Sequence, residues 1–248
     1  MILEKIETVS TNDDAKRLAD EGAAHFTVVW AHRQTGGRGS RGRGWTSIEG
    51  NVFWSVIIRP EKGWPTYSDL VYVQALSVLE AVSSQTGKDA ELTLKWPNDL
   101  LLNGRKAAGV LIETSGPYHD GQPAWVVMGV GINVIGHPSD VNTIYGATSL
   151  HAEGYRNVTR AALISSLLVR LQENIGLWRT HGFEPIRKAY LNRAHGLNST
   201  IRVGTNPERS KYVDGIYAGI DTDGALMLIL ADGRRKNFHS GEVMQVVG

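Results

Sequence analysis

The chain of 248 residues contains no cysteine. This excludes disulfide bonds, thiolate zinc sites and cysteine nucleophiles, although it fits a reducing compartment and an exported protein equally well. No apolar run approaches the length of a membrane span, and residues 1–22 lack the apolar stretch of a secretion signal. We therefore expect a cytoplasmic protein that has no membrane partner.

The chain also has almost no net charge, because 26 lysines and arginines balance 25 aspartates and glutamates. A general nucleic-acid binder would carry a larger basic excess. The eight histidines are scattered without the spacing of a zinc site, and no serine lies in a G-x-S-x-G elbow. A zinc site and hydrolysis by a serine nucleophile are therefore not expected.

Within this balanced sequence, residues 33–43 (RQTGGRGSRGR) combine arginines with glycines, and Trp45 follows them. Glycine lets the backbone approach a ligand closely, and arginine offers a planar set of donors that fits a phosphate or a carboxylate. The segment can be interpreted as a flexible, solvated basic loop, or as a loop that holds a small anion with its side chains and backbone amides. The near-neutral charge of the chain favours a small anion over a polyanion.

The spacing of apolar residues predicts both helices and strands before residue 196. Helices are expected from Ser10-Thr11-Asn12 onward and over 68–87, 159–179 and 183–193. Strands are expected over 26–31, 51–59, 91–96 and 125–134, with a hairpin at Asn103-Gly104 and an irregular loop over 138–155.

After Gly196 the pattern changes to five short strands, and Asp223-Gly224 and Asp232-Gly233 are typical hairpin turns. We therefore predict an α+β fold with two domains. Residues 1–195 would form a mixed β-sheet with flanking helices, and residues 196–248 would form a small β-barrel.

Lys95 lies in an apolar strand, directly before Pro97-Asn98-Asp99. An ammonium group is costly there unless it is paired or bound to an anion. The lysine can therefore be interpreted as a strand-end residue that reaches water or pairs with Asp99. The alternative is a point charge directed at a phosphate or carboxylate on which negative charge develops.

The segment Gly129-Val130-Gly131-Ile132-Asn133 would let a ligand lie against the backbone at a strand end. Glycines at such positions also mark bulges or close packing. The dinucleotide fingerprint G-x-G-x-x-G and the phosphate-binding motif G-x-x-x-x-G-K-[ST] are both missing. A nucleotide would therefore have to bind by another scheme.

Taken together, these segments resemble the signatures of the biotin protein ligase family. Residues 37–45 (GRGSRGRGW) are similar to the family pattern Gly-Arg-Gly-Arg-x-Gly-Arg-x-Trp, and KWPND at 95–99 matches its second signature. NGRKAAGVLIE at 103–113 and GVGIN at 129–133 match the continuation. The resemblance covers nearly the whole chain. It implies a class II synthetase-like catalytic domain of the biotin/lipoate ligase type and a C-terminal Src-homology-3-like barrel.

The resemblance implies a reaction in two steps. Biotin and ATP give biotinyl-5′-AMP and pyrophosphate, and biotin then passes to a lysine of a biotin carboxyl carrier protein or domain. Mg²⁺ is implied together with ATP, because a carboxylate and a triphosphate repel each other unless cations offset their charge. No DNA partner is expected, because the sequence begins almost directly with the helix of the catalytic domain.

The resemblance also assigns site residues by position, with Lys95 and Arg38 as the catalytic candidates and no metal ligand assigned. Lys95→Ala is accordingly expected to abolish adenylation without unfolding the protein. Biotin is expected to contact Ser10, Thr11, Asn12, Gln34, Gly37, Arg38, Gly39, Ser40, Trp45 and Lys95. The nucleotide is expected to contact Arg41, Arg43, Trp45, Asn98 and Asn133.

Two other functions are compatible with parts of the sequence. A lipoate or octanoate ligase shares the fold and the acyl-adenylate chemistry, although its arginine-glycine signature differs and KWPND argues for biotin. An RNA-binding module could use the arginine-glycine loop, but the near-zero net charge and the lack of aromatic RNP-like strands count against it. The sequence leaves monomer and homodimer equally open.

One residue departs from the family pattern, because Ser40 stands where an arginine usually follows Gly-Arg-Gly. A loop with one cation fewer should hold the anionic adenylate less tightly. We predict that the protein releases more reactive biotinyl-AMP than a Ser40→Arg variant does. Labelling of bystander proteins by the two forms measures this release, and equal labelling would show the prediction to be wrong.

Overall fold

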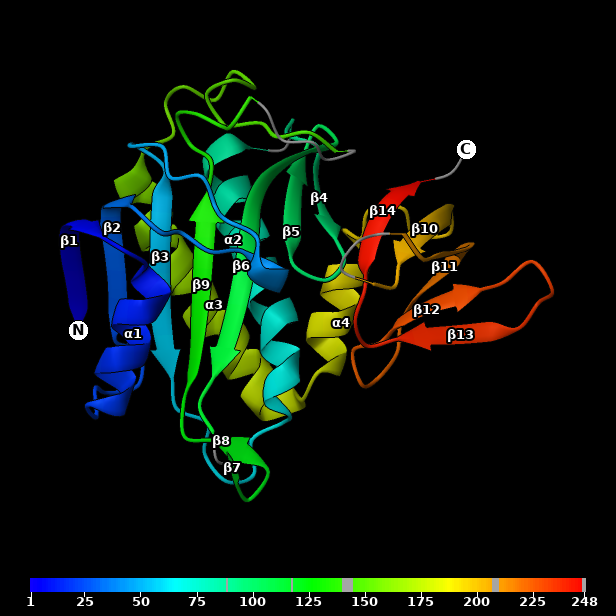
Figure 1. Cartoon of the computed structure of the whole chain (residues 1–248), viewed down its shortest axis with the longest axis horizontal. Helices are drawn as coiled ribbons and strands as arrows, with labels where there is room; N and C mark the ends of the chain where they lie inside the picture. Colours follow the sequence, from blue (N-terminus) through cyan, green and yellow to red (C-terminus); the bar gives the residue numbers. More distant parts are fainter. Residues whose placement is uncertain (88, 117, 140–144, 207–209, 247–248) are drawn as a thin grey trace.

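The computed structural model describes residues 1–87, 89–116, 118–139, 145–206 and 210–246. A large sheet with helices on both faces lies beside a smaller antiparallel sheet (Figure 1). This arrangement confirms the predicted α+β class. In the described part of the chain, no helix is long and apolar enough to cross a membrane.

The large sheet has seven strands in the order β1-β2-β3-β9-β6-β5-β4. Strands β1 and β2 run parallel, and every other neighbouring pair is antiparallel. The strands are β1 (Ile2–Thr8), β2 (Val28–Gln34), β3 (Val52–Ile58), β4 (Leu92–Lys95), β5 (Asp99–Leu102), β6 (Arg105–Thr114) and β9 (Val126–Ile132). A short hairpin of β7 (Tyr118–His119) and β8 (Gln122–Pro123) lies between β6 and β9 in the chain.

The predicted strands correspond to β2, β3, β4 and β9, and the hairpin predicted at Asn103-Gly104 joins β5 to β6. Strand β2 begins at Val28 rather than at Phe26, because Phe26 has a φ of 60° and lies in the turn before the strand. Strand β1 was not predicted. It is an edge strand that mixes apolar and charged residues, none of which is buried, so it lacks the apolar density of a buried strand.

Helices cover the large sheet on both faces (Figure 1). Helices α2 (Leu70–Thr86), α3 (Arg160–His181) and α4 (Glu184–Leu191) pack together, with α2 and α3 against one face of the sheet. The shorter α1 (Thr11–Asp20) lies on the opposite face, against β2, β3 and β9. These helices confirm the four predicted ones. Residues 138–139 and 145–155 contain no helix or strand, as expected, and residues 140–144 lie outside the described residues.

Alternation along the central strands divides the side chains between these two faces. On β3, for example, Trp54 and Val56 enter the main core beneath α2 and α3, whereas Ile57 packs with Ala15 and Ala19 of α1. Since α1 covers only part of its face, the rest of that face is available for a binding site.

The smaller sheet has the strand order β13-β12-β11-β10-β14. Its strands are β10 (Thr200–Gly204), β11 (Tyr212–Ile220), β12 (Leu226–Ile229), β13 (Arg235–Phe238) and β14 (Glu242–Val246). The hairpin turns predicted at Asp223-Gly224 and Asp232-Gly233 join β11 to β12 and β12 to β13. The five predicted strands are therefore present, and their closure into a barrel stays a prediction.

Tyr72 of α2 ties the two sheets together. Its hydroxyl donates a hydrogen bond to the backbone oxygen of Gly224, and it accepts one from Trp96 Nε1 at 2.8 Å. Tyr72 and Trp96 are both buried. The turn between β11 and β12 is thus held against α2 and the end of β4.

Candidate active site

Three glycines form a floor without side chains on the face of the sheet that α2 and α3 do not cover. Gly109 of β6 lies directly opposite Gly131 of β9, and Gly129 is two residues further along β9. Between them, Val130 points the other way and packs into the main core. The alternation that builds the core therefore also places the glycines on the open face.

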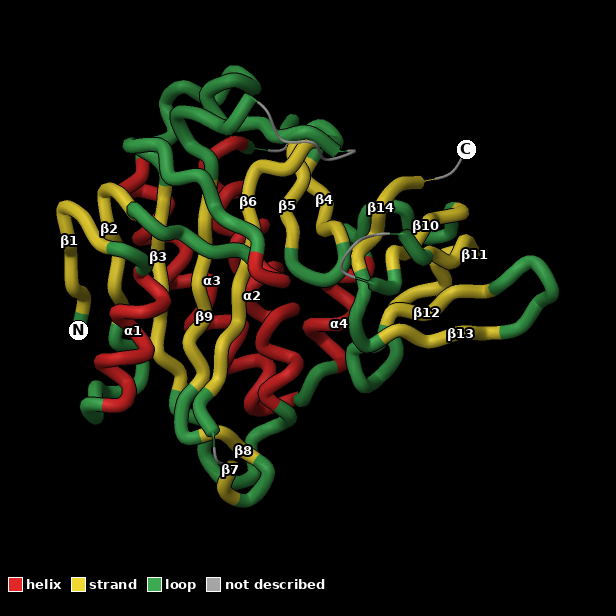
Figure 2. The backbone as a smooth tube through the Cα atoms, in the orientation of Figure 1, coloured by secondary structure: helices red, strands yellow, loops and turns green. Residues whose placement is uncertain are grey.

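Trp45 lies flat against this floor. A Cβ atom at Gly131 would lie 2.4 Å from the Trp45 ring, and one at Gly109 would lie 3.1 Å from it. The loop between β2 and β3 runs across the front of β9 and β6 (Figure 2). Its residue Trp45 thereby contacts Gly131 of β9 and Gly109 of β6. Within the loop, the Trp45 amide donates to the Gly37 carbonyl at 2.8 Å, and a Cβ at Gly37 would lie 2.7 Å from the Trp45 carbonyl oxygen. The absence of a side chain at Gly37 therefore allows the two ends of this loop segment to pack against each other.

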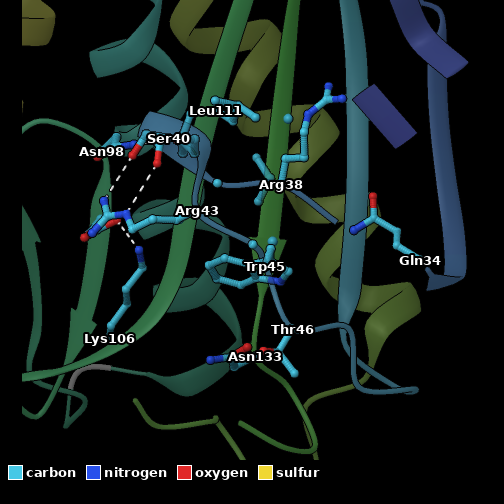
Figure 3. A pocket seen from close by; sticks show the side chains of 18 of the residues that line it. Gln34, Arg38, Ser40, Arg43, Trp45, Thr46, Asn98, Lys106, Leu111 and Asn133 are labelled. Atoms are coloured by element: carbon cyan, nitrogen blue, oxygen red, sulfur yellow. Dashed lines mark hydrogen bonds and ion pairs between the residues drawn. The ribbon is translucent and has the colours of Figure 1, made fainter. Parts of the chain in front are cut away.

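A cavity of about 160 Å³ opens between the glycine floor, the start of α1 and the arginine-glycine loop. Figure 3 shows Trp45 between Gln34 on one side and Lys106 and Arg43 on the other. Most residues predicted from the sequence line this cavity: Ser10, Thr11, Asn12, Gln34, Arg38, Gly39, Ser40, Arg43, Trp45, Asn98 and Asn133. Gly37, Arg41 and Lys95 do not line it.

Polar groups from α1 and β2 form one end of the cavity. The Thr11 amide donates to Gln34 Oε1 at 2.8 Å. Ser10 precedes the helix as its N-cap, but its hydroxyl makes no capping hydrogen bond. The start of α1, which is buried at the cavity wall, and these side chains together offer both donors and acceptors to a small polar ligand.

The arginines of the loop are mostly paired with carboxylates. Arg38 donates to Asp13 at 2.8 Å and to Glu113 at 3.0 Å. Arg43 lies 3.0 Å from Glu242, at the start of β14 in the smaller sheet. These ion pairs hold the loop over the sheet and link it to the C-terminal part of the chain.

Lys95 lines a second cavity of about 190 Å³, which adjoins the first and is also lined by Arg41 and Glu242. Its side chain is 5% exposed, and its Nζ lies 2.8 Å from Asp99 Oδ2 and 3.8 Å from Glu242. The pairing of Lys95 with Asp99, one of the two interpretations of the sequence, is therefore what the structure shows.

Asp99 lies between two lysines, because its Oδ1 is 2.6 Å from Lys106 Nζ. Burial alone would raise the pKa of Asp99, but the charges and hydrogen bonds of Lys106 and Lys95 outweigh it and hold that pKa well below its usual range. Asp99 is thus ionised at neutral pH and fixes the ammonium groups of both lysines.

Lys106 is the lysine that lines the main cavity beside Arg38 and Arg43, and it was not among the residues predicted from the sequence. Its side chain is 28% exposed, and its Nζ lies 5.5 Å from the centre of the Trp45 ring. Leu100 pairs with Ala108 but Leu101 pairs with Lys106, so Ala107 is an extra residue in β6. This bulge brings Lys106 to the side of Gly109, although strict alternation would place it on the opposite face.

Asn98 and Asn133, the two asparagines predicted to contact a nucleotide, both line the cavity. Their amide groups donate hydrogen bonds to backbone carbonyl groups. Asn98 Nδ2 donates to the Val110 carbonyl at 2.6 Å, and Asn133 Nδ2 donates to the Thr148 carbonyl at 3.0 Å. These bonds fix the wall of the cavity beside Trp45.

Comparisons with known proteins agree with this geometry. Residues 7–133 match the model of the Biotin/lipoate A/B protein ligase family, and residues 196–244 match the Biotin protein ligase C terminal domain. The Biotin--[acetyl-CoA-carboxylase] ligase of Paracoccus denitrificans is 37% identical over 92% of this chain and 94% of the relative. That of Mycobacterium tuberculosis is 34% identical over 97% of this chain and 87% of the relative.

A solved structure extends the comparison to the fold. Biotin protein ligase from Aquifex aeolicus in complex with biotin and ATP has a TM-score of 0.81 and 26% sequence identity to this chain. The match covers 97% of this chain and 96% of the other. The chain therefore belongs to the biotin/lipoate A/B protein ligase family and, within it, to the biotin protein ligases.

We predict that Gly131→Ala displaces Trp45, because a methyl group at this position would overlap its ring. The loop would then lose its contact with the floor, and biotin binding should weaken by about tenfold or more, as expected for the loss of a tightly packed aromatic contact. Titration calorimetry with biotin measures the change. Gly176→Ala on α3 is the matched control, since nothing lies within 4 Å of its new methyl group. Equal biotin affinity in both variants would contradict the prediction.

Proposed function

We propose that this protein activates biotin with ATP to give biotinyl-5′-AMP and pyrophosphate, and then transfers biotin to a lysine of a biotin carboxyl carrier domain. One observation carries the proposal: a single cavity combines a polar end at Thr11 and Gln34 with a cationic end at Lys106 and Arg43. Biotin has a polar ureido head at one end and a carboxylate at the other, and it would span these two ends.

The two alternatives are less well supported. The C-terminal match is to a domain named for biotin protein ligases, which favours biotin over lipoate or octanoate. For an RNA-binding module, the loop arginines should be available to phosphates. Arg33, Arg38 and Arg43 are instead paired with carboxylates.

We assign the ureido head to the pocket of Ser10, Thr11, Asn12 and Gln34. The tail would then cross the glycine floor beneath the loop, and its carboxylate would reach Lys106. The nucleotide would lie on the far side of Trp45, near Arg43, Asn98 and Asn133, with Arg41 at the adjoining cavity. The domain boundary at 195/196 and a cytoplasmic location, where ATP is at hand, are part of the same proposal.

In the first step, a carboxylate oxygen of biotin attacks the α-phosphorus of ATP. An oxygen–phosphorus bond forms, and the bond to the leaving pyrophosphate breaks. The carboxylate is already a nucleophile, so the protein has to position the reactants and offset their negative charge. We propose Lys106 for this role, because Asp99 fixes its ammonium at the cavity wall. Lys95 balances the charge of Asp99 and acts as a positioning residue, which revises its assignment as the catalytic lysine.

In the second step, the amine of the carrier lysine attacks the acyl carbon of the adenylate, an amide bond forms and AMP leaves. Mg²⁺ would neutralise charge on the phosphates. Among the described residues, no group of three histidine, aspartate or glutamate side chains could hold a metal ion. This fits Mg²⁺ carried largely by the phosphates, with few protein ligands.

ATP–pyrophosphate exchange tests the function directly. We expect exchange when purified protein and Mg²⁺ are supplied with biotin, and none with lipoate, octanoate or no acid, because only biotin carries a ureido head for the polar pocket. Exchange with lipoate or octanoate instead of biotin would contradict the assigned substrate. Absence of exchange with every acid would contradict the adenylation reaction itself.

The roles of the two lysines can be separated by substitution. We predict that Lys106→Met lowers kcat of biotin-dependent exchange by about 100-fold or more, the usual effect of removing a group that stabilises transition-state charge. Lys95→Met should mainly lower the thermal unfolding temperature, because Lys95 is buried and Asp99 would lose one counter-charge. If the Lys106 variant keeps a normal kcat while the Lys95 variant is inactive but stably folded, Lys95 and not Lys106 would be the catalytic lysine.

A further inference from the structure

Glu113 of β6 takes no part in the reaction described above, yet it binds Asn12 and Arg38, two residues that line the cavity. Its carboxylate accepts hydrogen bonds from Asn12 Nδ2 at 2.8 Å, Lys16 Nζ at 2.8 Å and Arg38 Nη2 at 3.0 Å. Burial opposes ionisation of Glu113, but the hydrogen bonds of Lys16 and Asn12 and the charges of Lys16 and Arg38 hold its pKa below the ordinary value. At neutral pH the side chain is a carboxylate, which can only accept hydrogen bonds.

This carboxylate fixes the orientation of the Asn12 amide. Because Glu113 only accepts, the NH₂ group of Asn12 must face it, and the amide oxygen must face Ser55 Oγ at 2.6 Å. A flipped amide would bring its oxygen against the carboxylate, with two acceptors in contact. Asn12 is 4% exposed and packs on Gly129, where a Cβ would lie 2.1 Å from its oxygen, so the amide cannot swing away into solvent.

The orientation of Asn12 decides in turn which way two hydroxyl groups point. Ser55 carries one hydroxyl hydrogen, and the amide oxygen of Asn12 takes it. Ser55 Oγ also lies 2.8 Å from Thr11 Oγ1, and because the Ser55 hydrogen is taken by Asn12, the hydrogen of this contact comes from Thr11. Gln34 Oε1, the other acceptor beside the Thr11 hydroxyl, is further away at 3.1 Å and already accepts the backbone N–H of Thr11 at 2.8 Å. With its hydrogen directed inward, the Thr11 hydroxyl offers a lone pair to the cavity, and Gln34 offers its NH₂ group.

We propose that Glu113 is a positioning residue that sets the hydrogen-bond polarity of the biotin head pocket. Through Asn12 and Ser55 it makes Thr11 Oγ1 an acceptor, which is the partner that a ureido N–H requires. The inference rests on the proposed function, since it takes biotin as the ligand. Without a charge at residue 113 the chain of hydrogen bonds can reverse. Ser55 would then donate to Thr11, and the Thr11 hydrogen would be free to point at Gln34 Oε1, 3.1 Å away, or at the ureido N–H.

Glu113 also binds Arg38 of the loop. A substitution of Glu113 therefore removes this ion pair as well as the constraint on the Asn12–Ser55–Thr11 hydrogen bonds, and the test has to separate the two effects. Asp13 provides the matched control. It lies 2.8 Å from Arg38 Nη1 and 3.0 Å from Lys16 Nζ, the same two cations that Glu113 binds, but it is not part of the Asn12–Ser55–Thr11 chain. Asp13→Asn removes one negative charge beside Arg38 and leaves the polarity of the pocket intact.

The experiment compares Glu113→Gln and Asp13→Asn in ATP–pyrophosphate exchange. The substrates are biotin and its two oxazolidinone analogues, in each of which an oxygen replaces one ureido N–H. A site built to bind an N–H group rejects such an analogue strongly, so wild-type protein should prefer biotin over at least one analogue by about 100-fold or more in kcat/KM. Glu113→Gln should reduce this preference about tenfold and raise KM for biotin about tenfold, with kcat nearly unchanged. Asp13→Asn should leave the preference unchanged.

The inference would be overturned if Glu113→Gln and Asp13→Asn changed KM equally and neither changed the preference for biotin over its analogues. Glu113 would then act only by binding Arg38. Ser55→Ala interrupts the same chain and should reduce the preference without adding to the effect of Glu113→Gln in the double variant. It also replaces Glu113→Gln as the test if that variant does not fold. Wild-type protein that shows no exchange with biotin would contradict the proposed function, and this inference with it.

Discussion

The site depends on the absence of side chains at Gly109, Gly129 and Gly131. A Cβ at Gly131 would collide with Trp45 and one at Gly129 with the Asn12 amide, while one at Gly109 would crowd the Trp45 ring at 3.1 Å. The neighbouring residues on the same strands, such as Val130, point the other way and fill the main core. The binding site and the core therefore lie on opposite faces of the same strands, and α2 and α3 pack against the core face.

A second organising feature is the buried carboxylate of Asp99 between Lys95 and Lys106. Removing one partner from a buried ion pair leaves an uncompensated charge and typically costs about 3 to 5 kcal/mol. This cluster fixes the ammonium of Lys106 at the cavity wall and joins the β4–β5 hairpin to β6. Glu242 extends it into the smaller sheet through Lys95 and Arg43. The C-terminal strands thereby take part in holding the loop.

Most of the fold could be predicted from local patterns in the sequence. Apolar spacing predicted the four helices, and Asn103-Gly104 marked its hairpin. Most cavity residues were predicted instead from the resemblance to the family signatures, which did not single out Lys106. Lys106 reaches the cavity through a bulge at Ala107, which reverses the alternation and leaves no mark in the sequence. Lys95 stands out in an apolar strand, but the reason is its pairing with Asp99 across the β4–β5 hairpin. The role of Glu113 requires contacts between residues far apart in the chain.

The most direct test of the account is a crystal structure of the protein with a sulfamate analogue of biotinyl-5′-AMP. We expect the ureido head between Thr11 and Gln34, with Lys106 Nζ within hydrogen-bond distance, about 3 Å, of the group that replaces the phosphate. Asp99 should still hold Lys95 beneath the cavity. An analogue bound in the adjoining cavity, with Lys95 released from Asp99 and in contact with the phosphate position, would contradict it.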